Sequence, residues 1–252
     1  DIGIAMGERG TRSAREVAAI VLLDDNFRTI VRAIAEGRQL YRNLKLSFAY
    51  LLMVHMPLVA TAALIPFAGF PLLYLPVHIV WLELIIHPTA LLVFQREAPE
   101  GALDPHGGGA GPRFFGALEW LVVALTGVAI TLAVVAGYDY SLGLGRNVEE
   151  ARAMALVTLI LAGSGVTAGL SGLSTLLAAV IAAGSILSAF VATQIPALAA
   201  LLHLAPLHVD DWLLAAGAGA VAGAMAACLP RLSAGAGWSG IAFRGRRPPG
   251  RR

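Results

Sequence analysis

Three side chains that could bind a metal ion or a proton lie in two apolar stretches of the chain. His55 is in the first stretch, and Glu83 and His87 are in the second. Glu83 and His87 are four residues apart, so on a helix they share one face. Ionisable groups are costly inside a membrane-spanning segment and mark an ion path by default. Imidazole beside carboxylate suits a proton or a borderline metal such as zinc or manganese. We therefore expect a cation site here.

Two prolines adjoin these candidate ligands. Pro88 directly follows His87, and Pro57 lies two residues after His55. Pro88 lacks a backbone N–H and clashes with the carbonyl group of Leu84, and broken helices with free carbonyl oxygens recur in membrane cation sites. We expect helix breaks at both prolines, which would add oxygen ligands to the site. The alternative is that the histidines only form hydrogen bonds between helices.

Calcium fits this set of ligands poorly. A calcium site takes six to eight oxygen ligands, and Glu83 is the one carboxylate well inside the apolar stretches, since Glu119 lies near the start of the third. The fourth stretch offers only the hydroxyl groups of Ser164 and Thr167. The remaining histidines are expected outside the site, at a membrane edge or in loops: His78, His106, His203 and His208.

Composition places these residues in a membrane protein. Of 252 residues, 58% are hydrophobic and 13% are charged, against about 45–50% and 25% in soluble domains, which excludes a soluble enzyme and a disordered chain. The single cysteine, Cys228, excludes a disulfide framework and a cysteine zinc site. A membrane helix needs about 20 apolar residues. Six stretches qualify, which predicts a mainly α-helical six-helix bundle: residues 46–66, 74–94, 117–137, 152–171, 174–194 and 211–230.

The basic residues predict the orientation of this bundle. Sixteen of the eighteen Lys and Arg residues lie before the first span, between the second and third, or after the last. Only Arg146 and Arg152 lie on the opposite side. Because positive charge is enriched in cytoplasmic loops, we expect both ends of the chain in the cytoplasm. The arginine-rich end of the chain is expected to bind anionic lipid and no nucleic acid.

The first 45 residues have a soluble character. Residues 3–7 are typical of a strand that runs into a glycine turn, residues 11–19 of a helix, and residues 20–23 of a short buried strand. Residues 24–26 are suited to cap a helix that begins near Phe27. This order predicts the last β-α-β unit of a parallel sheet, followed by a helical stalk into the membrane.

These first 45 residues resemble cation-transporting P-type ATPases. The resemblance rests on GIAMG at residues 3–7, VLLDDNF at 21–27 and YRN at 41–43. It continues in order through the apolar part, with ARAMA at 151–155 and DWLL at 211–214. In that family, the first run closes the phosphorylation domain, which has an α/β HAD-like fold, and a stalk leads into the fifth membrane helix.

The resemblance implies three parts of the chain. Residues 1–45 would be the end of the phosphorylation domain and the stalk, residues 46–230 the transmembrane helices five to ten, and residues 231–252 a basic cytoplasmic tail. By family position, Glu83 and His87 replace an Asn and an Asp of calcium pumps. His55 replaces an Asn, and Leu58 stands where an acidic residue is expected. Five residues would be remnants of the phosphorylation domain: Gly3, Gly7, Asp24, Asp25 and Asn26.

The function that the resemblance implies is the transport domain and coupling stalk of an ATP-driven cation pump in a bacterial plasma membrane. Its partners would be the lipid bilayer, the transported cation (a proton or a divalent metal) and the N-terminal part of the pump. Such pumps use ATP and Mg²⁺, but the motifs DKTGT, TGES and GDGxNDxP do not occur in this sequence. We therefore expect the chain alone to bind neither cofactor and to hydrolyse no ATP.

Two other functions remain open. One is a non-pumping membrane scaffold or regulatory protein that kept the fold of the family and lost its chemistry. The other is a proton-coupled secondary transporter, which would account for ionisable residues in the spans but not for residues 1–45.

Overall fold

The computed structural model describes residues 2–95 and 114–235 of the chain. His106 and most of the predicted basic tail lie outside the described residues. The chain divides into two units, one formed mainly by Asp1–Lys45 and the other by Leu46–Phe94 together with Gly109–Arg252. Each unit is described by itself.

The first unit is a small β-α-β arrangement. Its elements in chain order are β1 (Ile4–Met6), α1 (Arg12–Val17), β2 (Ile20–Leu22) and the start of α2 (Phe27–Phe67). The two strands pair in parallel, with Ile4 opposite Ile20. Thr11 caps α1, because its hydroxyl oxygen accepts a hydrogen bond of 3.2 Å from the N–H of Ala14. The parallel β-α-β order predicted from the sequence is therefore confirmed.

Polar side chains hold the turns of this unit. The carboxylate of Asp25 accepts hydrogen bonds from the N–H groups of Glu8 (3.0 Å) and Arg9 (2.8 Å). Desolvation raises the pKa of Asp25, but these N–H groups outweigh it and the pKa is lowered. The hydroxyl group of Thr29 donates to Asp24 and lowers the pKa of that carboxyl. Asn26 accepts from the N–H of Arg28 at 3.0 Å, so it caps α2 as expected.

Glycine is required at one of the two predicted glycine positions. A Cβ atom on Gly7 would lie 2.7 Å from the carbonyl oxygen of Leu22, where the turn after β1 crosses β2. Around Gly3 the nearest atom is 3.8 Å from such a Cβ, so the space there would admit a side chain. The turn after β1 therefore requires glycine at position 7, whereas a larger residue would fit at position 3.

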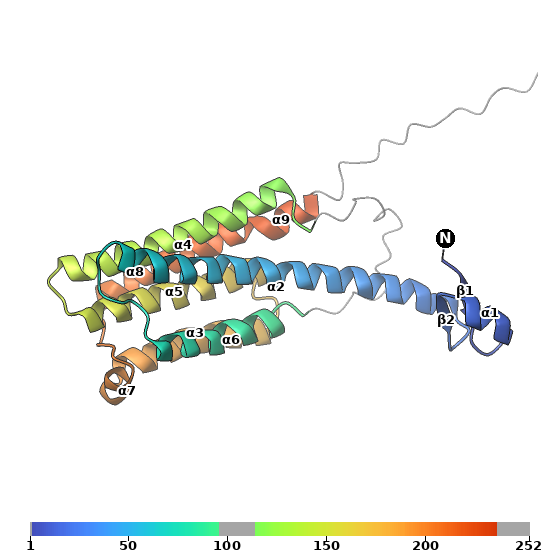
Figure 1. The fold of residues 1–252 in the computed structure, drawn as a ribbon, viewed down its shortest axis with the longest axis horizontal. Coiled ribbons are helices and arrows are strands. Elements are labelled where there is room, and N and C mark those ends of the chain that lie inside the picture. The colour runs from blue at the N-terminus through green and yellow to red at the C-terminus, as the bar shows by residue number, and fades with distance from the viewer. Residues whose placement is uncertain (1, 96–113, 236–252) are drawn as a thin grey trace, which may run out of the picture. The chain divides into compact units, whose positions relative to one another are not determined.

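The second unit is a helical bundle built around α5 (Figure 1). Of the most apolar part of α5, 83% is buried, against 28–44% in the other long helices, so α5 forms the core. It packs against α4, α6 and α8. The elements after α2 are α3 (Pro76–Leu92), α4 (Ala117–Gly143), α5 (Val148–Ser171), α6 (Leu176–Gln194), α7 (Pro196–Leu201), α8 (Val209–Ala226) and α9 (Cys228–Gly235).

Small residues let α5 and α8 approach closely. A Cβ atom on Gly165 of α5 would lie 2.0 Å from the carbonyl oxygen of Gly219 on α8. One turn further along, Gly169 faces Gly223 in the same way, at 2.2 Å. Small residues at a spacing of four are typical of close contacts between membrane helices. The glycine spacing on α5 and α8 therefore serves helix packing.

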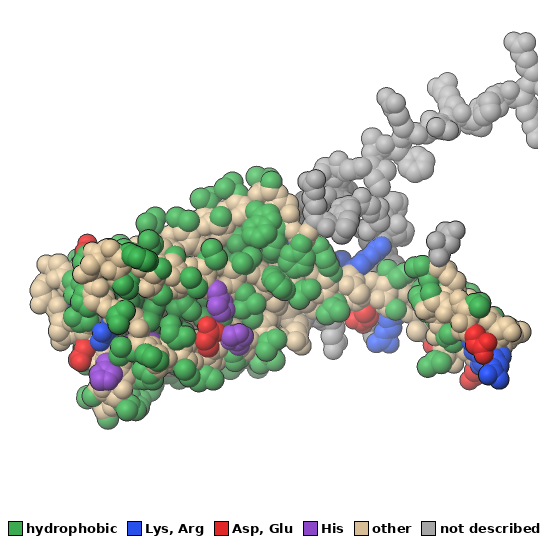
Figure 2. Space-filling view, in the orientation of Figure 1, with side chains coloured by type: hydrophobic (Ala, Val, Ile, Leu, Met, Phe, Trp, Pro, Cys, Tyr) green, Lys and Arg blue, Asp and Glu red, His purple; other side chains and the backbone are tan. Residues whose placement is uncertain are grey.

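Within residues 2–95 and 114–235, five helical segments are long and apolar enough to cross a membrane, by length and composition: Phe27–Phe67, Ala117–Gly143, Val148–Ser171, Leu176–Gln194 and Val209–Leu232. The second predicted stretch, residues 74–94, forms the shorter helix α3 of 17 residues. That helix begins at Pro76 because proline fits the first helical position, where no backbone donor is needed. Large apolar side chains cover the visible outer surface of the bundle (Figure 2). The chain is thus a mainly helical, polytopic membrane protein.

Candidate cation site

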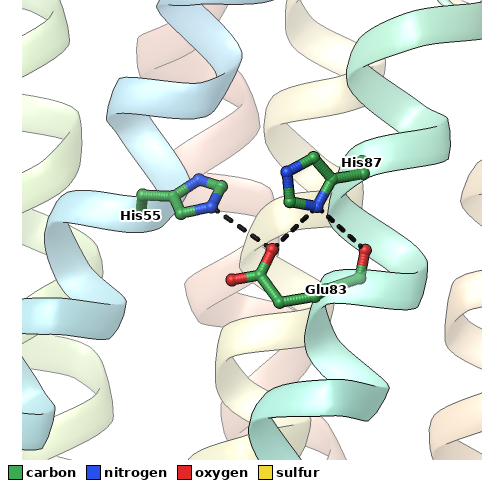
Figure 3. A group of neighbouring side chains, drawn as sticks. All are labelled: His55, Glu83 and His87. Atoms are coloured by element: carbon green, nitrogen blue, oxygen red, sulfur yellow. Dashed lines mark hydrogen bonds and ion pairs between the residues drawn. The ribbon is translucent and has the colours of Figure 1, made fainter.

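The structure brings His55, Glu83 and His87 together in the second unit (Figure 3). His55 comes from α2, and the other two residues come from α3. One carboxylate oxygen, Oε2 of Glu83, lies 2.8 Å from Nδ1 of His87 and 3.5 Å from Nε2 of His55. One nitrogen or oxygen atom from each residue lies within 4.8 Å of the other two. All three residues predicted as ion ligands therefore meet at one point.

Each imidazole ring is oriented by a carbonyl group of its own helix. Nδ1 of His55 lies 3.2 Å from the carbonyl oxygen of Leu51, and Nδ1 of His87 lies 3.3 Å from that of Glu83. A carbonyl oxygen only accepts hydrogen bonds, so in each ring Nδ1 carries the proton. In a neutral His55, the lone pair of Nε2 then faces Glu83.

The carboxylate oxygen at the centre of this cluster lacks a hydrogen bond. Oε2 of Glu83 is buried and accepts no hydrogen bond of adequate geometry in the described part of the chain, even from the nearby His87 ring. A buried acceptor without a donor loses its interaction with water and gains nothing in return. The lone pair of Nε2 of His55 and this unsatisfied carboxylate oxygen thus face each other, and a cation between them would satisfy both.

The cluster is partly open within this chain. The side chains of His55 and Glu83 are 32% and 31% exposed, and that of His87 is 60% exposed. Figure 2 shows acidic and histidine side chains next to one another on an otherwise largely apolar face of the bundle. An ion could therefore reach the cluster from the side of His87.

The predicted helix breaks at the two prolines are absent from these described helices. Pro57 lies inside α2 and Pro88 lies inside α3, and both helices continue through them. Packing against neighbouring helices lets a membrane helix tolerate proline. What each proline removes is one backbone donor, so the carbonyl oxygens of Met53 and Leu84 lose their usual partner four residues later.

The two hydroxyl groups predicted on the fourth stretch lie at a different place. Ser164 and Thr167 of α5 line a cavity of about 10 Å³ together with Tyr50 and Ile85. Neither the two histidines nor Glu83 lines that cavity. The structure therefore does not add these hydroxyl groups to the candidate site.

Glu119 has a capping role. Its carboxylate oxygen Oε2 accepts a hydrogen bond of 2.8 Å from the N–H of Gly116, directly before α4. Glu119 is thus held at the first turn of its helix, as its position near the start of the third stretch suggested.

His78 is a buried side chain at the start of α3. Nδ1 of His78 accepts from the N–H of Leu75 at 3.1 Å, and Nε2 lies 2.6 Å from the carbonyl oxygen of Leu202. The ring therefore joins the start of α3 to the segment after α7. The contact spans 124 residues, so sequence spacing gave no sign of it.

A buried ion pair was also missed from the sequence. Nη1 of Arg146 lies 2.7 Å from both carboxylate oxygens of Asp211, which is fully buried. The hydrogen bond that Arg146 donates to the Asp211 carboxylate raises the pKa of Arg146. Asp211 also accepts from the N–H of His208, at the start of α8. An acidic residue in the first turn of an apolar helix was the available signal, but its arginine partner lies 65 residues away.

Comparison with known proteins finds similarity to cation-transporting ATPases. The family described as "Cation transporting ATPase, C-terminus" matches residues 71–232. The chain is 34% identical over 168 residues to a calcium-transporting ATPase of Bacillus subtilis, covering 64% of this chain and 18% of that protein. It is 46% identical over 100 residues to a calcium-transporting ATPase of Plasmodium falciparum, covering 40% of this chain and 8% of that protein. It is 40% identical over 101 residues to the cation-transporting ATPase pma1 of Synechocystis, covering 39% of this chain and 11% of that protein.

The matches thus span less than a fifth of the length of these relatives.

Proposed function

Because the chain belongs to the family of C-terminal regions of cation-transporting ATPases, we propose that it is the transport domain of an ATP-driven P-type cation pump. In this proposal residues 46–230 are the transmembrane helices five to ten, and residues 1–45 are the end of a HAD-like phosphorylation domain and its stalk. Residues 231–252 form a basic tail on anionic lipid. Both ends lie on the cytoplasmic side of a bacterial plasma membrane.

In this proposal the short helix α3 crosses the membrane together with the five longer helical segments, which makes six spans. Its 17 residues rise about 26 Å at 1.5 Å per residue, which is close to the hydrocarbon thickness of about 30 Å. Helix α3 also carries Glu83 and His87, two of the three candidate ligands. A short helix that bears the ionisable groups is compatible with a site in the membrane interior.

The observation that carries the proposal is the convergence of two imidazoles on the buried oxygen of Glu83. In a span, an ionisable group needs a partner or a function. Here the carboxylate has no hydrogen-bond donor of good geometry, whereas a proton or a divalent cation would satisfy it. Glu83, His87 and His55 are therefore the proposed ion ligands.

ATP and Mg²⁺ would act elsewhere in the pump. The carboxylates of Asp24 and Asp25 are occupied by Thr29, Asn26 and the backbone of the turn at residues 8–9. These contacts give Asp24 and Asp25 a role in holding the turns of this unit together. What this chain contributes is the ion site and the helix that reaches it.

Helix α2 is the proposed coupling element. It begins at Phe27, directly after the β-α-β unit, and carries His55 further along the same helix. The contact of His55 with Glu83 is the one ligand contact that joins α2 to α3. A shift of α2 along α3 would therefore separate His55 from the other two ligands, which remain together on α3, and would weaken the hold on the ion.

The test is cation-stimulated ATP hydrolysis by the complete pump polypeptide that contains this chain. Glu83→Gln should reduce cation-stimulated turnover at least about tenfold, because the replacement keeps the shape and removes the charge. His203→Asn is the matched control, since His203 is exposed and lies outside the cluster, and its φ of 51° is tolerated by Asn.

Two results would count against this proposal. Full cation-dependent turnover of Glu83→Gln, with unchanged apparent affinity, would place the ion site elsewhere. Absence of any cation-stimulated hydrolysis by the unmodified, folded protein would favour a scaffold or regulatory protein of the same fold.

A further inference from the structure

The donor atoms of the cluster are those of a borderline metal. Two imidazole nitrogens and one carboxylate converge on the same point. Calcium takes six to eight oxygen ligands, and magnesium takes six. Imidazole instead suits zinc and its neighbours in the first transition row. Calcium would have to accept two nitrogen ligands and only one carboxylate.

The distances are close to those of a tetrahedral site. Zinc bonds of about 2.0–2.1 Å place two ligand atoms about 3.3 Å apart. The separation of Nε2 of His55 from Oε2 of Glu83 is 3.5 Å, and that of Nδ1 of His87 from the same oxygen is 2.8 Å. The first separation already fits, and the second requires an opening of about 0.5 Å, which small side-chain rotations supply.

The orientation of His55 is that of a metal ligand. Its Nδ1 donates to the carbonyl oxygen of Leu51, and ligating histidines almost always donate their other ring N–H in this way. Its Nε2 then presents a lone pair to the carboxylate of Glu83, so two acceptors face each other at 3.5 Å. Only a cation between them makes this arrangement favourable.

A proton would be held by fewer atoms of the cluster than a metal ion would. A proton joins one nitrogen to one oxygen, whereas both imidazoles here approach the same carboxylate oxygen. The rings are 5.9 Å apart between centroids and inclined at 75°, so both present nitrogen edges to one region. To bind through Nδ1, His87 would move its ring proton from Nδ1, which faces the carbonyl oxygen of Glu83, to Nε2.

We infer that the transported cation is a borderline divalent transition metal of the Zn²⁺ class, bound by Glu83, His55 and His87. This inference rests on the proposed function. Three protein ligands leave one position of a tetrahedral metal open, as in zinc sites that exchange their fourth ligand. The side chain of His87 is 60% exposed, so the cluster is accessible on the side of His87. An incomplete ligand set suits an ion that must enter and leave.

The experiment measures Zn²⁺ binding by the complete protein in lipid nanodiscs, by metal analysis after equilibrium dialysis against buffered Zn²⁺. The unmodified protein should hold one more Zn²⁺ than Glu83→Gln. His55→Gln and His87→Gln should each weaken that site about 100-fold or more, since even residues that only support metal ligands cost 10–100-fold. His203→Asn should bind as the unmodified protein does. X-ray absorption at the zinc edge should show imidazole scattering that both histidine variants reduce.

The outcomes separate this inference from the proposed function. Loss of cation-stimulated ATP hydrolysis in Glu83→Gln without any difference in Zn²⁺ content would keep the ion site and overturn the metal class. The metal class would also be overturned, and the ion site kept, if the site bound calcium in preference to Zn²⁺ and Glu83→Gln lost that calcium. Equal Zn²⁺ content and equal turnover in all variants would overturn both. If Glu83→Gln fails to fold, the two histidine variants decide.

Discussion

Substitution of Gly165 by alanine is expected to destabilise the bundle by forcing apart its two most closely packed helices. The new Cβ atom would lie 2.0 Å from the carbonyl oxygen of Gly219 and 2.8 Å from its carbonyl carbon. A carbon–oxygen contact in proteins normally measures at least about 3.3 Å. Helices α5 and α8 must therefore separate by about 1 Å, or rotate. The obstacle is backbone, so no side chain can turn away to relieve it.

The expected cost follows from two opposing effects. Overpacking in a close contact costs about 1–3 kcal/mol and sometimes more, whereas replacement of a helical glycine by alanine gains up to about 1 kcal/mol. We expect a net loss of about 2 kcal/mol in the free energy of unfolding. For a chain of this size, such a loss lowers the melting temperature by about 4–8 °C.

The assay is thermal unfolding of the purified protein in detergent, followed by tryptophan fluorescence. Gly217→Ala is the matched control on α8, because a Cβ atom there would meet nothing within 4 Å. That variant should melt at the same temperature as the unmodified protein or slightly higher. Equal melting temperatures for Gly165→Ala and Gly217→Ala would refute the reasoning that the contact between α5 and α8 is limited by backbone approach.

Three further predictions concern polar contacts. Arg146→Gln should lower the free energy of unfolding by about 3 kcal/mol, because the buried Asp211 would lose its ion-pair partner. Thermal unfolding measures this loss, and Arg231→Gln is the control on an exposed arginine. His78→Ala should cost about 2 kcal/mol and leave Zn²⁺ affinity unchanged in dialysis. Asp25, whose folded-state pKa is lowered, should stabilise residues 2–26 above its unfolded pKa of about 3.9 and stop doing so as pH falls through the folded-state value. Hydrogen exchange of β1 and β2 would then rise in acid, and Asp25→Asn should remove much of that pH dependence.

Local chemistry made much of the fold predictable from the sequence. The parallel β-α-β order followed from short apolar runs and turn residues, and the capping role of Asn26 followed from its own side chain. The apolar stretches predicted the long helices because about 20 apolar residues are needed to cross a bilayer. Each of these features depends on residues a few positions apart, so no knowledge of distant contacts is needed.

The candidate site was predictable only in part. Glu83 and His87 are one helical turn apart, so their contact is a property of α3 alone. That His55 completes the cluster depends on the packing of α2 against α3. Both helices also continue through Pro57 and Pro88, where proline chemistry alone predicted a break.

The choice of the central helix was decided by tertiary structure. The mean hydropathy of α5, 1.9, lies within the range of 1.8 to 2.3 of the other long helices, yet α5 alone among these described helices is mostly buried. Lipid tails and a protein interior are both apolar, so hydropathy cannot separate a core helix from a lipid-facing one. The sequence by itself determined which segments enter the membrane and which side chains there are ionisable. Only the packing of small residues such as Gly165 on Gly219 decided which helix lies at the centre, and only the packing of α2 on α3 brought His55 to Glu83.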